Sequence, residues 1–318
     1  MQPLLLLARQ SHGSLASLCD ELCRRNIPFY RFATSQYPSE IVSSLRISQE
    51  REEISWFSKE HTRIPLEDSK VIFFQDYDQP SREVIYDRTI MKYLQEEGDA
   101  FLQSMYWGLA SRYWVNDPFA SARAENKPQQ LALAARRGLR IPATLVTNSL
   151  TEATTFFQTF PKGCVIKPLK CNRIEDTSGI KVMMTRRISD TFPLETIRSG
   201  PCFFQEYIPK SLELRVFVIG EEVLATAISA PQEIVDWRTA VSTIKVEPYT
   251  LDPTLALQCK EITQEMGLHY AALDLALDQQ GYPVFFEINP TGEWAWFECR
   301  TGAPLSSTLV DHLLAHNL

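Results

Sequence analysis

The sequence of 318 residues predicts an α+β fold with several subdomains, and three observations support this prediction. The first 35 residues alternate strand, amphipathic helix and strand, which indicates the start of a small parallel sheet. Helical and strand patterns then alternate from residue 126 onward. Finally, apolar strands at 270–277 and 283–288 flank a tight turn at Gln279-Gln280-Gly281, which predicts an antiparallel hairpin. Alternating units with late hairpins are typical of α+β proteins.

The composition limits the classes of partner. A net charge of −7, with no Lys/Arg run and no aromatic-basic RNA motif, argues against a nucleic-acid partner and favours a small molecule or a peptide. The seven scattered cysteines fit free thiols in a reducing compartment. The apolar run at 4–7 is too short for a signal-peptide core, and no run reaches transmembrane length. We therefore expect a cytoplasmic protein that does not interact with a membrane.

The N-terminal third predicts a small α/β unit. We expect strands at 4–7, 28–32 and 71–74 and helices at 15–25 and 82–112. The loop after the first strand has one glycine and no GxGxxG motif, so dinucleotide binding is not supported. The charged run at 50–53 predicts the exposed face of a helix. The pattern breaks at 114–118, which we take as the first domain boundary.

The remaining elements follow the same patterns. Asn126 is placed to cap a helix that ends near Gly138. Further helices are expected at 151–160, 255–266 and 306–316, and strands at 144–146, 164–168, 178–185, 203–208, 215–219 and 223–227. His312 and His316 share one helical face, which we expect to be exposed.

Three polar residues on the late hairpin suggest a metal site. Glu287 and Asn289 are two positions apart and point to the same face of an extended strand, and the hairpin brings Asp274 alongside them. Two carboxylates and an amide oxygen are hard ligands that suit Mg²⁺ carrying nucleotide phosphates. The alternative is a strand that simply ends in polar residues at a turn. Trp294, Trp296 and Phe297 follow, and we expect core packing for them ahead of a peptide groove.

The order of motifs gives the strongest signal. Two lysines, Lys127 and Lys167, precede Gln205-Glu206-Tyr207-Ile208 and Glu213-Leu214-Arg215-Val216, and the Asp274, Glu287 and Asn289 set follows. This order resembles the ATP-grasp ligases. Longer matches, including Pro209–Val216, Asp236-Trp237-Arg238 and Glu287–Trp294, resemble the microviridin-type (graspetide) peptide maturases of that superfamily. The resemblance covers residues 110–318 well and the N-terminal third only in outline.

The resemblance implies an ATP-grasp fold with three domains. These are an N-terminal pre-ATP-grasp α/β domain (1–115), a central domain (116–204) and a C-terminal domain with the Mg-ATP site (205–318). It also implies an ATP-dependent ligase that activates Asp or Glu side chains of a ribosomally made precursor peptide as acyl phosphates. Attack by Ser/Thr or Lys then closes ester or amide rings. A homodimer is expected, as in related maturases.

The resemblance also implies residue roles. Asp274, Glu287 and Asn289 would hold Mg²⁺, and Lys127 and Lys167 would hold ATP phosphates. The segment Gln205, Glu206, Tyr207 and Ile208 would read adenine, with Glu213 near the ribose. Arg215 and Arg238 would grip the reacting carboxylate as planar forks. A helix at 189–198 would recognise the leader of the precursor through Asp190 and Glu195; a solvated helix face is the alternative.

Two features depart from the ATP-grasp pattern. Many of these ligases carry an arginine two residues before the metal-binding aspartate, where this chain has Ala272. The loop at 169–179, expected to cover the phosphates, has a single glycine. Two other functions remain open. One is a ligase that adds a free amino acid to a peptide or protein, as polyglutamate ligases do, and the other is a nucleotide-binding protein without catalysis.

Overall fold

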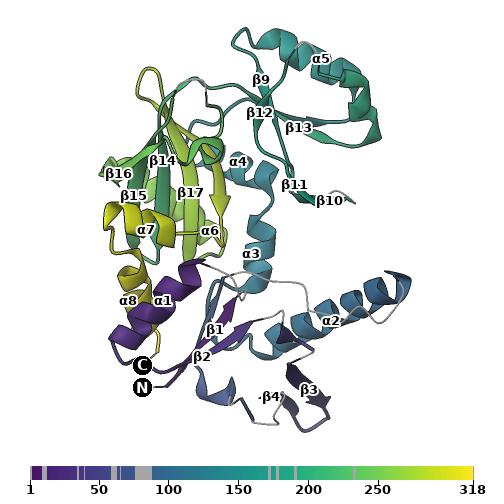
Figure 1. Cartoon of the computed structure of the whole chain (residues 1–318), viewed down its shortest axis with the longest axis vertical. Helices are drawn as coiled ribbons and strands as arrows, with labels where there is room; N and C mark the ends of the chain where they lie inside the picture. Colours follow the sequence, from purple (N-terminus) through teal and green to yellow (C-terminus); the bar gives the residue numbers. More distant parts are fainter. Residues whose placement is uncertain are drawn as a thin grey trace.

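The computed structural model describes residues 2–8, 13–33, 36–38, 40–58, 63–64, 66–75, 88–170, 173–176, 179–189, 192–231 and 234–317. A four-stranded parallel sheet with the order β2-β1-β6-β7 forms the lower part of the molecule (Figure 1). Its strands are β1 (Leu4–Ala8), β2 (Phe29–Ala33), β6 (Val71–Phe74) and β7 (Tyr113–Val115), and α1 (Gly13–Arg24) connects the first two. The two inner strands of this sheet, β1 and β6, are buried along their whole length. The predicted parallel βαβ start is confirmed.

An antiparallel sheet beside this layer was not predicted. It consists of β3 (Ile41–Ile47), β4 (Glu52–Ser58) and β5 (Arg63–Ile64). The predicted helical face at 50–53 is wrong, because Ser48 N bonds to Arg51 O in a turn and β4 begins at Glu52. The charged run has no apolar residue to fix a period, whereas the strand that follows it buries Trp56. After η2 (Leu66–Asp68), the long helix α2 occupies Arg88–Gly108; positions 82–87 of the predicted helix lie outside the described residues.

The central part of the chain contains an antiparallel sheet with the order β12-β9-β13-β8. Its elements are β8 (Thr144–Thr147), α5 (Leu150–Thr159), β9 (Cys164–Lys167), β12 (Arg186–Arg187), η3 (Leu194–Ser199) and β13 (Cys202–Glu206). The strand expected at 178–185 is the shorter β11 (Gly179–Val182), which pairs with β10 (Arg173–Asp176) in a separate hairpin. Sequence patterning missed β10 because its residues are mostly charged.

The largest layer is a five-stranded antiparallel sheet, β16-β15-β14-β17-β18. Its strands are β14 (Lys210–Ile219), β15 (Glu222–Ser229), β16 (Lys245–Tyr249), β17 (Tyr270–Asp278) and β18 (Pro283–Asn289). Its helices and connections are α3 (Pro118–Ala124), α4 (Lys127–Arg136), η4 (Trp237–Ala240), α6 (Pro253–Glu265), α7 (Ala295–Thr301) and α8 (Leu305–Ala315). The expected β17–β18 hairpin is present, and Asn126 caps α4 by accepting a hydrogen bond from Gln129 N, as predicted.

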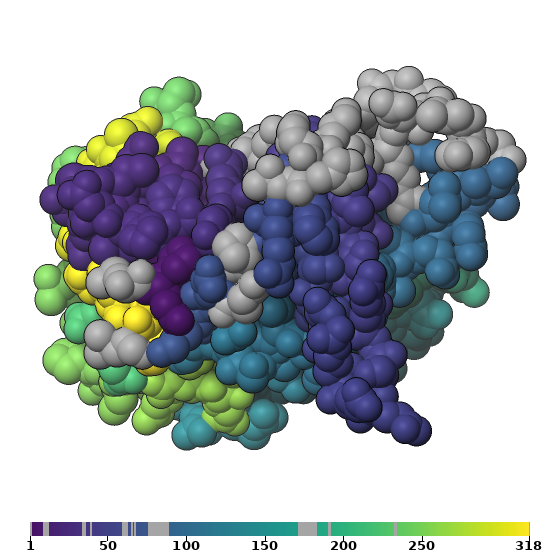
Figure 2. All heavy atoms as spheres, turned by 90° about the horizontal axis from the view of Figure 1, so that it is seen from below, coloured from purple at the N-terminus to yellow at the C-terminus, as the bar shows by residue number. Residues whose placement is uncertain are grey.

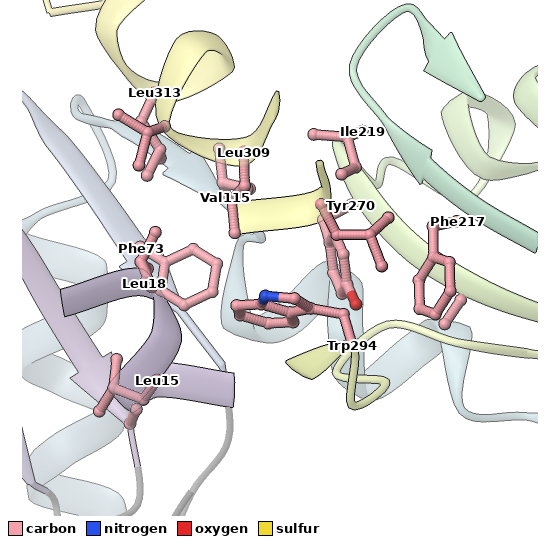
Figure 3. Packing of buried hydrophobic residues seen from close by; sticks show 14 of the residues in the cluster. Leu15, Leu18, Phe73, Val115, Phe217, Ile219, Tyr270, Trp294, Leu309 and Leu313 are labelled. Atoms are coloured by element: carbon pink, nitrogen blue, oxygen red, sulfur yellow. The ribbon is translucent and has the colours of Figure 1, made fainter. Parts of the chain in front are cut away.

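The two ends of the chain pack together. Helix α1 lies against α8 and α7, and Figure 2 shows the purple N-terminal segment beside the yellow C-terminal one. Trp294 is fully buried between the layers: its ring meets Phe73 edge-on at 6.0 Å and Tyr270 at 5.5 Å (Figure 3). Core packing, the role favoured for the aromatics that follow Asn289, therefore holds for Trp294 and for the buried Phe297. Such shared burial joins the N-terminal layer to the five-stranded sheet.

The face expected to be exposed at His312 and His316 is only partly so. His312 is half-buried, and its Nε2 lies 3.2 Å from the hydroxyl of Tyr113. The exposed His316 stacks on the Tyr113 ring at 3.8 Å. Burial, and then the neighbouring His316, lower the pKa of His312 to about 4. Within the described part of the chain, no helix has both the length and the apolar character needed to cross a membrane.

Candidate active site

A pocket of about 520 Å³ is lined by the central sheet and the five-stranded sheet, within the range of small-molecule sites. Its walls come from β9, β13, β14, β17 and β18. Every nucleotide, metal and carboxylate-binding residue implied by the family resemblance lines it: Lys127, Lys167, Gln205, Glu206, Tyr207, Ile208, Glu213, Arg215, Arg238, Asp274, Glu287 and Asn289. Residues separated by more than 150 positions in the chain therefore meet at one concave surface.

The β17–β18 hairpin places three oxygen-bearing side chains on one face. Asp274 lies directly opposite Glu287 in the ladder, and Ala272 lies opposite Asn289. Opposed side chains of an antiparallel pair are close neighbours on the same face of the sheet. Among the residues that the structure describes, no group of three or more His, Cys, Asp or Glu gathers, so the candidate set is two carboxylates and one amide. That donor set fits a magnesium ion that takes its remaining ligands from phosphate and water.

Two arginines bind the same carboxylate. Arg215 Nη1 donates to Asp274 Oδ1 at 2.7 Å, and Arg238 Nη2 donates to Asp274 Oδ2 at 2.9 Å. Burial alone would raise the pKa of Asp274, but the two guanidinium groups hold it below its usual range. Asp236 also accepts from Arg238 Nη1 at 3.2 Å and so fixes the orientation of that fork. The site therefore keeps a carboxylate ionised between two planar cations.

Two lysines also line the pocket near these carboxylates. Lys127 Nζ lies 3.2 Å from Glu287 Oε2 and donates to Pro168 O. Lys167 Nζ lies over the Phe203 ring, 5.2 Å from its centroid, and burial lowers the pKa of this amine to about 8. A buried ammonium is costly without an anion, so a phosphate group here would replace the hydration that Lys167 has lost.

In the segment that the family resemblance assigns to adenine binding, most backbone N–H groups already have acceptors within the protein. Glu206 N donates to Ala143 O, and Tyr207 N donates to Gly163 O. Gln205 is buried, and its Nε2 donates to the hydroxyl of Thr144. Among the described residues, the N–H of Ile208 is the backbone donor of Glu206–Ile208 that has no backbone acceptor.

Next to this segment, Glu213 is paired with Lys210, whose Nζ lies 2.8 Å from Glu213 Oε1. Burial raises the pKa of Glu213 despite this lysine. Both side chains line the pocket, so a nucleotide ribose that reached this wall would meet an acceptor whose charge is already balanced.

The part of the chain that forms this pocket is similar to a known family of proteins. Residues 124–313 match the model of the RimK-like ATP-grasp domain, which is more than half of the chain. The chain belongs to this family. A ribosomal protein bS6–L-glutamate ligase of Salmonella paratyphi B is 26% identical over 215 residues, which are 65% of this chain and 69% of the relative.

Two solved structures cover nearly the entire chain. The macrocyclase MdnC of Microcystis aeruginosa MRC, bound with its precursor peptide MdnA, matches with a TM-score of 0.89 and 25% identity, over 98% of this chain and 99% of that one. The ATP-grasp ligase PsnB, complexed with a precursor variant, Mg and ADP, matches with a TM-score of 0.79 and 22% identity, over 100% and 99% of the two chains. The ATP-grasp fold predicted from the sequence, and the resemblance to peptide maturases, are confirmed.

Other residues that shape this ATP-grasp site had no predicted role. Gly292 lies where a Cβ would be 2.4 Å from Ala272 Cβ and 2.6 Å from Arg215 Nη2. Its carbonyl accepts from the Tyr270 hydroxyl at 2.5 Å, and buried Gln75 donates to Thr291 O at 2.9 Å. Gly292 stood within a motif that matches the maturases, whereas the sequence gave no sign that Gln75 approaches it.

The N-terminal domain also binds the end of the same loop. Ser14 Oγ donates to Glu293 Oε2 at 2.6 Å and accepts from the backbone N–H groups of Trp294 and Ala295. Ser14 is the second residue of α1, so the first turn of that helix receives a carboxylate, which its dipole stabilises. The loop behind Arg215 is thus attached to the N-terminal layer at two points, through Gln75 and Ser14.

Of the two residues predicted to recognise a leader, Glu195 is not among the residues that line this pocket. Asp190 lies outside the described residues. Glu195 is exposed in η3 and pairs with Arg198 Nε at 2.9 Å. Within the described residues of the stretch 189–198, the helix is a short 3₁₀ helix, Leu194–Ser199, which begins directly after Pro193.

Proposed function

We propose that this protein is an ATP-dependent ligase that closes ester or amide rings within a ribosomally made precursor peptide. The observation that carries the proposal is the double guanidinium grip at Asp274, beside Glu287 and facing Lys127 and Lys167. A ligase of this kind must bring a substrate carboxylate against the γ-phosphate although both are anionic. Two planar forks and two ammonium groups in one pocket offset that repulsion.

The residues would divide the work as follows. Bound Mg-ATP supplies the phosphoryl group and charge neutralisation, and Asp274, Glu287 and Asn289 would hold its metal. Lys127 and Lys167 would bind phosphate oxygens as point charges. On substrate binding, a peptide Asp or Glu would replace Asp274 as a partner of Arg238, whose side chain is 38% exposed, while Arg215, at 6%, stays fixed.

The bonds formed and broken in the proposed reaction balance, and no further reactant is needed. A carboxylate oxygen of the peptide attacks the γ-phosphorus, the bond to the β-phosphate oxygen breaks, and ADP leaves. A Ser/Thr hydroxyl or Lys amine of the same peptide then attacks the acyl carbon and releases inorganic phosphate. The net result is one ring and the loss of one water from the peptide.

The test is the mass of the co-encoded precursor after incubation with ATP and Mg²⁺. The wild-type protein is expected to remove one water per ring. Arg238→Ala is expected to bind ATP normally but leave the precursor intact, and Arg238→Lys to rescue poorly, because a point charge does not replace a fork. Arg136→Ala, an exposed arginine on α4, is the matched control. Full dehydration by Arg238→Ala would show that this residue does not hold the substrate.

A second candidate is the addition of free glutamate to a peptide or protein, supported by the 26% identical glutamate ligase. The same mass measurement separates the two, since glutamate addition raises the mass and ring closure lowers it. A protein that binds ATP but changes neither substrate would have the catalytically silent function.

Five further features belong to the proposal. The net charge of −7 supports a partner other than nucleic acid, and the cysteine pattern supports a cytoplasmic location. A homodimer is expected by analogy with related maturases. The domain limits 1–115, 116–204 and 205–318 are part of the proposal, and the end of β7 at Val115 supports the first of them. Leader recognition through Asp190 and Glu195 stays a proposal on the central domain.

A further inference from the structure

A pair of stacked tryptophans with an arginine at each end leads out of the pocket. It consists of Arg238, Trp237, Trp296 and Arg300, and we refer to it as the Trp–Arg ladder. The Arg238 guanidinium carbon lies 4.9 Å from the centre of the Trp237 ring system. Trp237 stacks on Trp296 with 5.7 Å between centroids and 21° between planes. The Arg300 guanidinium carbon lies 5.0 Å from the Trp296 centroid.

The ladder is continuous with the reacting end of the pocket. Arg238 donates to Asp274, and Trp237 itself lines the pocket. Phe297, also in the pocket wall, meets the Trp237 ring edge-on at 5.8 Å and the Trp296 ring at 4.9 Å. The contacts from Arg238 to Arg300 therefore run from η4, which contains Trp237 and Arg238, to α7, which contains Trp296 and Arg300.

The outer end of the ladder is accessible and positively charged. Arg300 is exposed, and the described residues give it no ion pair; its contact is the Trp296 ring. Both tryptophans are half-buried, so each keeps part of an apolar ring in water. Phe297 belongs to the hydrophobic core, and Trp237 and Trp296 pack against that core but stay partly exposed, with a guanidinium at each end of the pair. Rigid aromatic faces beside arginine are the usual composition of a site that holds a peptide.

We propose that the Trp–Arg ladder holds the acidic segment of the substrate peptide that flanks the reacting carboxylate. This inference rests on the proposed function and adds to it a second contact region. The peptide backbone and methylene groups would lie on the Trp237–Trp296 pair, and a second Asp or Glu would bind Arg300. The inner carboxylate would then reach Arg238, which orients it towards the phosphate. A substrate with two spaced carboxylates is therefore favoured over one with a single carboxylate.

The experiment measures peptide binding by fluorescence anisotropy with the full chain and Mg-ADP. The probe is a fluorescein-labelled peptide of repeated Thr-Asp-Glu units, and its Thr-Asn-Gln counterpart is the neutral control. Wild-type protein is expected to prefer the acidic probe. Arg300→Glu and Trp296→Ala should each weaken its binding about tenfold, as expected for loss of one charge-assisted or aromatic contact. Trp296→Phe, which keeps a ring, should retain most of the affinity.

Matched controls separate this role from a structural one. Trp107→Ala removes a tryptophan that is 66% exposed on α2, and Arg136→Glu reverses an exposed charge on α4; both should bind the probe as wild type does. All variants should keep the wild-type affinity for ADP, since neither Trp296 nor Arg300 is among the residues that line the pocket. Equal probe binding by wild type and Arg300→Glu, or equal losses in the controls, would overturn the proposal.

Failure of the ladder and failure of the proposed function give different results. If the protein does not form ADP with any carboxylate peptide, the ligase assignment fails whatever the anisotropy shows. If it forms rings while Trp296→Ala and Arg300→Glu bind the acidic probe normally, the ligase assignment stands and the ladder is refuted.

Discussion

Replacing Gly292 by alanine tests whether the loop behind Arg215 sets the geometry of the active site. The new Cβ would lie 2.4 Å from Ala272 Cβ and 2.6 Å from Arg215 Nη2. Ala272 is fully buried in β17, the strand between β14 and β18, so it has little freedom to move. The Arg215 side chain and the loop must therefore absorb the collision.

The size of the effect follows from these distances. Non-bonded carbon atoms normally lie about 3.5 Å or more apart. The new Cβ and the atoms that it would meet must therefore move apart by roughly 1 Å. Overpacking of this kind costs about 1–3 kcal/mol of folding free energy. A shift of about 1 Å in a group that orients the substrate costs on the order of 100-fold in rate. We therefore expect Gly292→Ala to lower kcat about 100-fold while the protein remains folded.

The assay combines ADP formation with the precursor, the melting temperature and ATP affinity. Gly200→Ala is the control, because its Cβ would meet no atom within 4 Å and its backbone is extended at φ 174°. A purely structural effect would lower the melting temperature but leave the rate per folded molecule unchanged. Wild-type kcat in Gly292→Ala would refute the argument that this glycine makes room for Arg215.

Three other perturbations test separate parts of the structure. Lys167→Ala is expected to weaken ATP about tenfold or more in titration calorimetry, through loss of a charge-assisted phosphate contact, while exposed Lys92→Ala leaves it unchanged. Asn116→Ala should lower the unfolding free energy by about 3 kcal/mol or more in denaturant titrations. Its side chain bonds two backbone N–H and two carbonyl groups, and no loss would refute this anchoring role. Burial lowers the pKa of His312 to about 4 in the folded protein, whereas the same side chain in the unfolded chain has a pKa of about 6.5. As the pH falls between these two values, the unfolded chain binds a proton that the folded protein does not, so the free energy of unfolding falls. His312→Gln should flatten this fall in melting curves, and an unchanged slope would assign it to other groups.

The part of the site that follows from local spacing was predictable. The distance from Asp274 to Glu287 fits a hairpin, and the structure pairs these two residues directly. Apolar strands such as β6 stand out because they are buried on both faces and contain no polar interruption. The order of the lysines, the arginine and the hairpin then indicated the family without any knowledge of contacts.

The contacts that hold the site in place were not predictable in this way. Gln75 meets Thr291 across 216 positions, and Ser14 meets Glu293 across 279. No spacing rule relates residues so distant, because the pairing depends on how two layers pack rather than on either segment. The sheet β3–β4–β5 was missed for the same reason. Its half-buried strands alternate only weakly between buried and exposed residues, and they are held in place by packing on α2 and on the β2 side of the core.

These long-range contacts connect the N-terminal third to the candidate active site although it lies largely outside the matched ATP-grasp segment. The loop of Gly292 has Arg215 on one side and Gln75 on the other, so its position is set by both layers. Gln75 Oε1 is buried and, among the described residues, has no hydrogen-bond partner, so its amide gains its hydrogen bonds only through that loop. A change in the N-terminal layer that moved Gln75 would therefore reach the guanidinium of Arg215 through the backbone of Gly292, without touching the pocket itself.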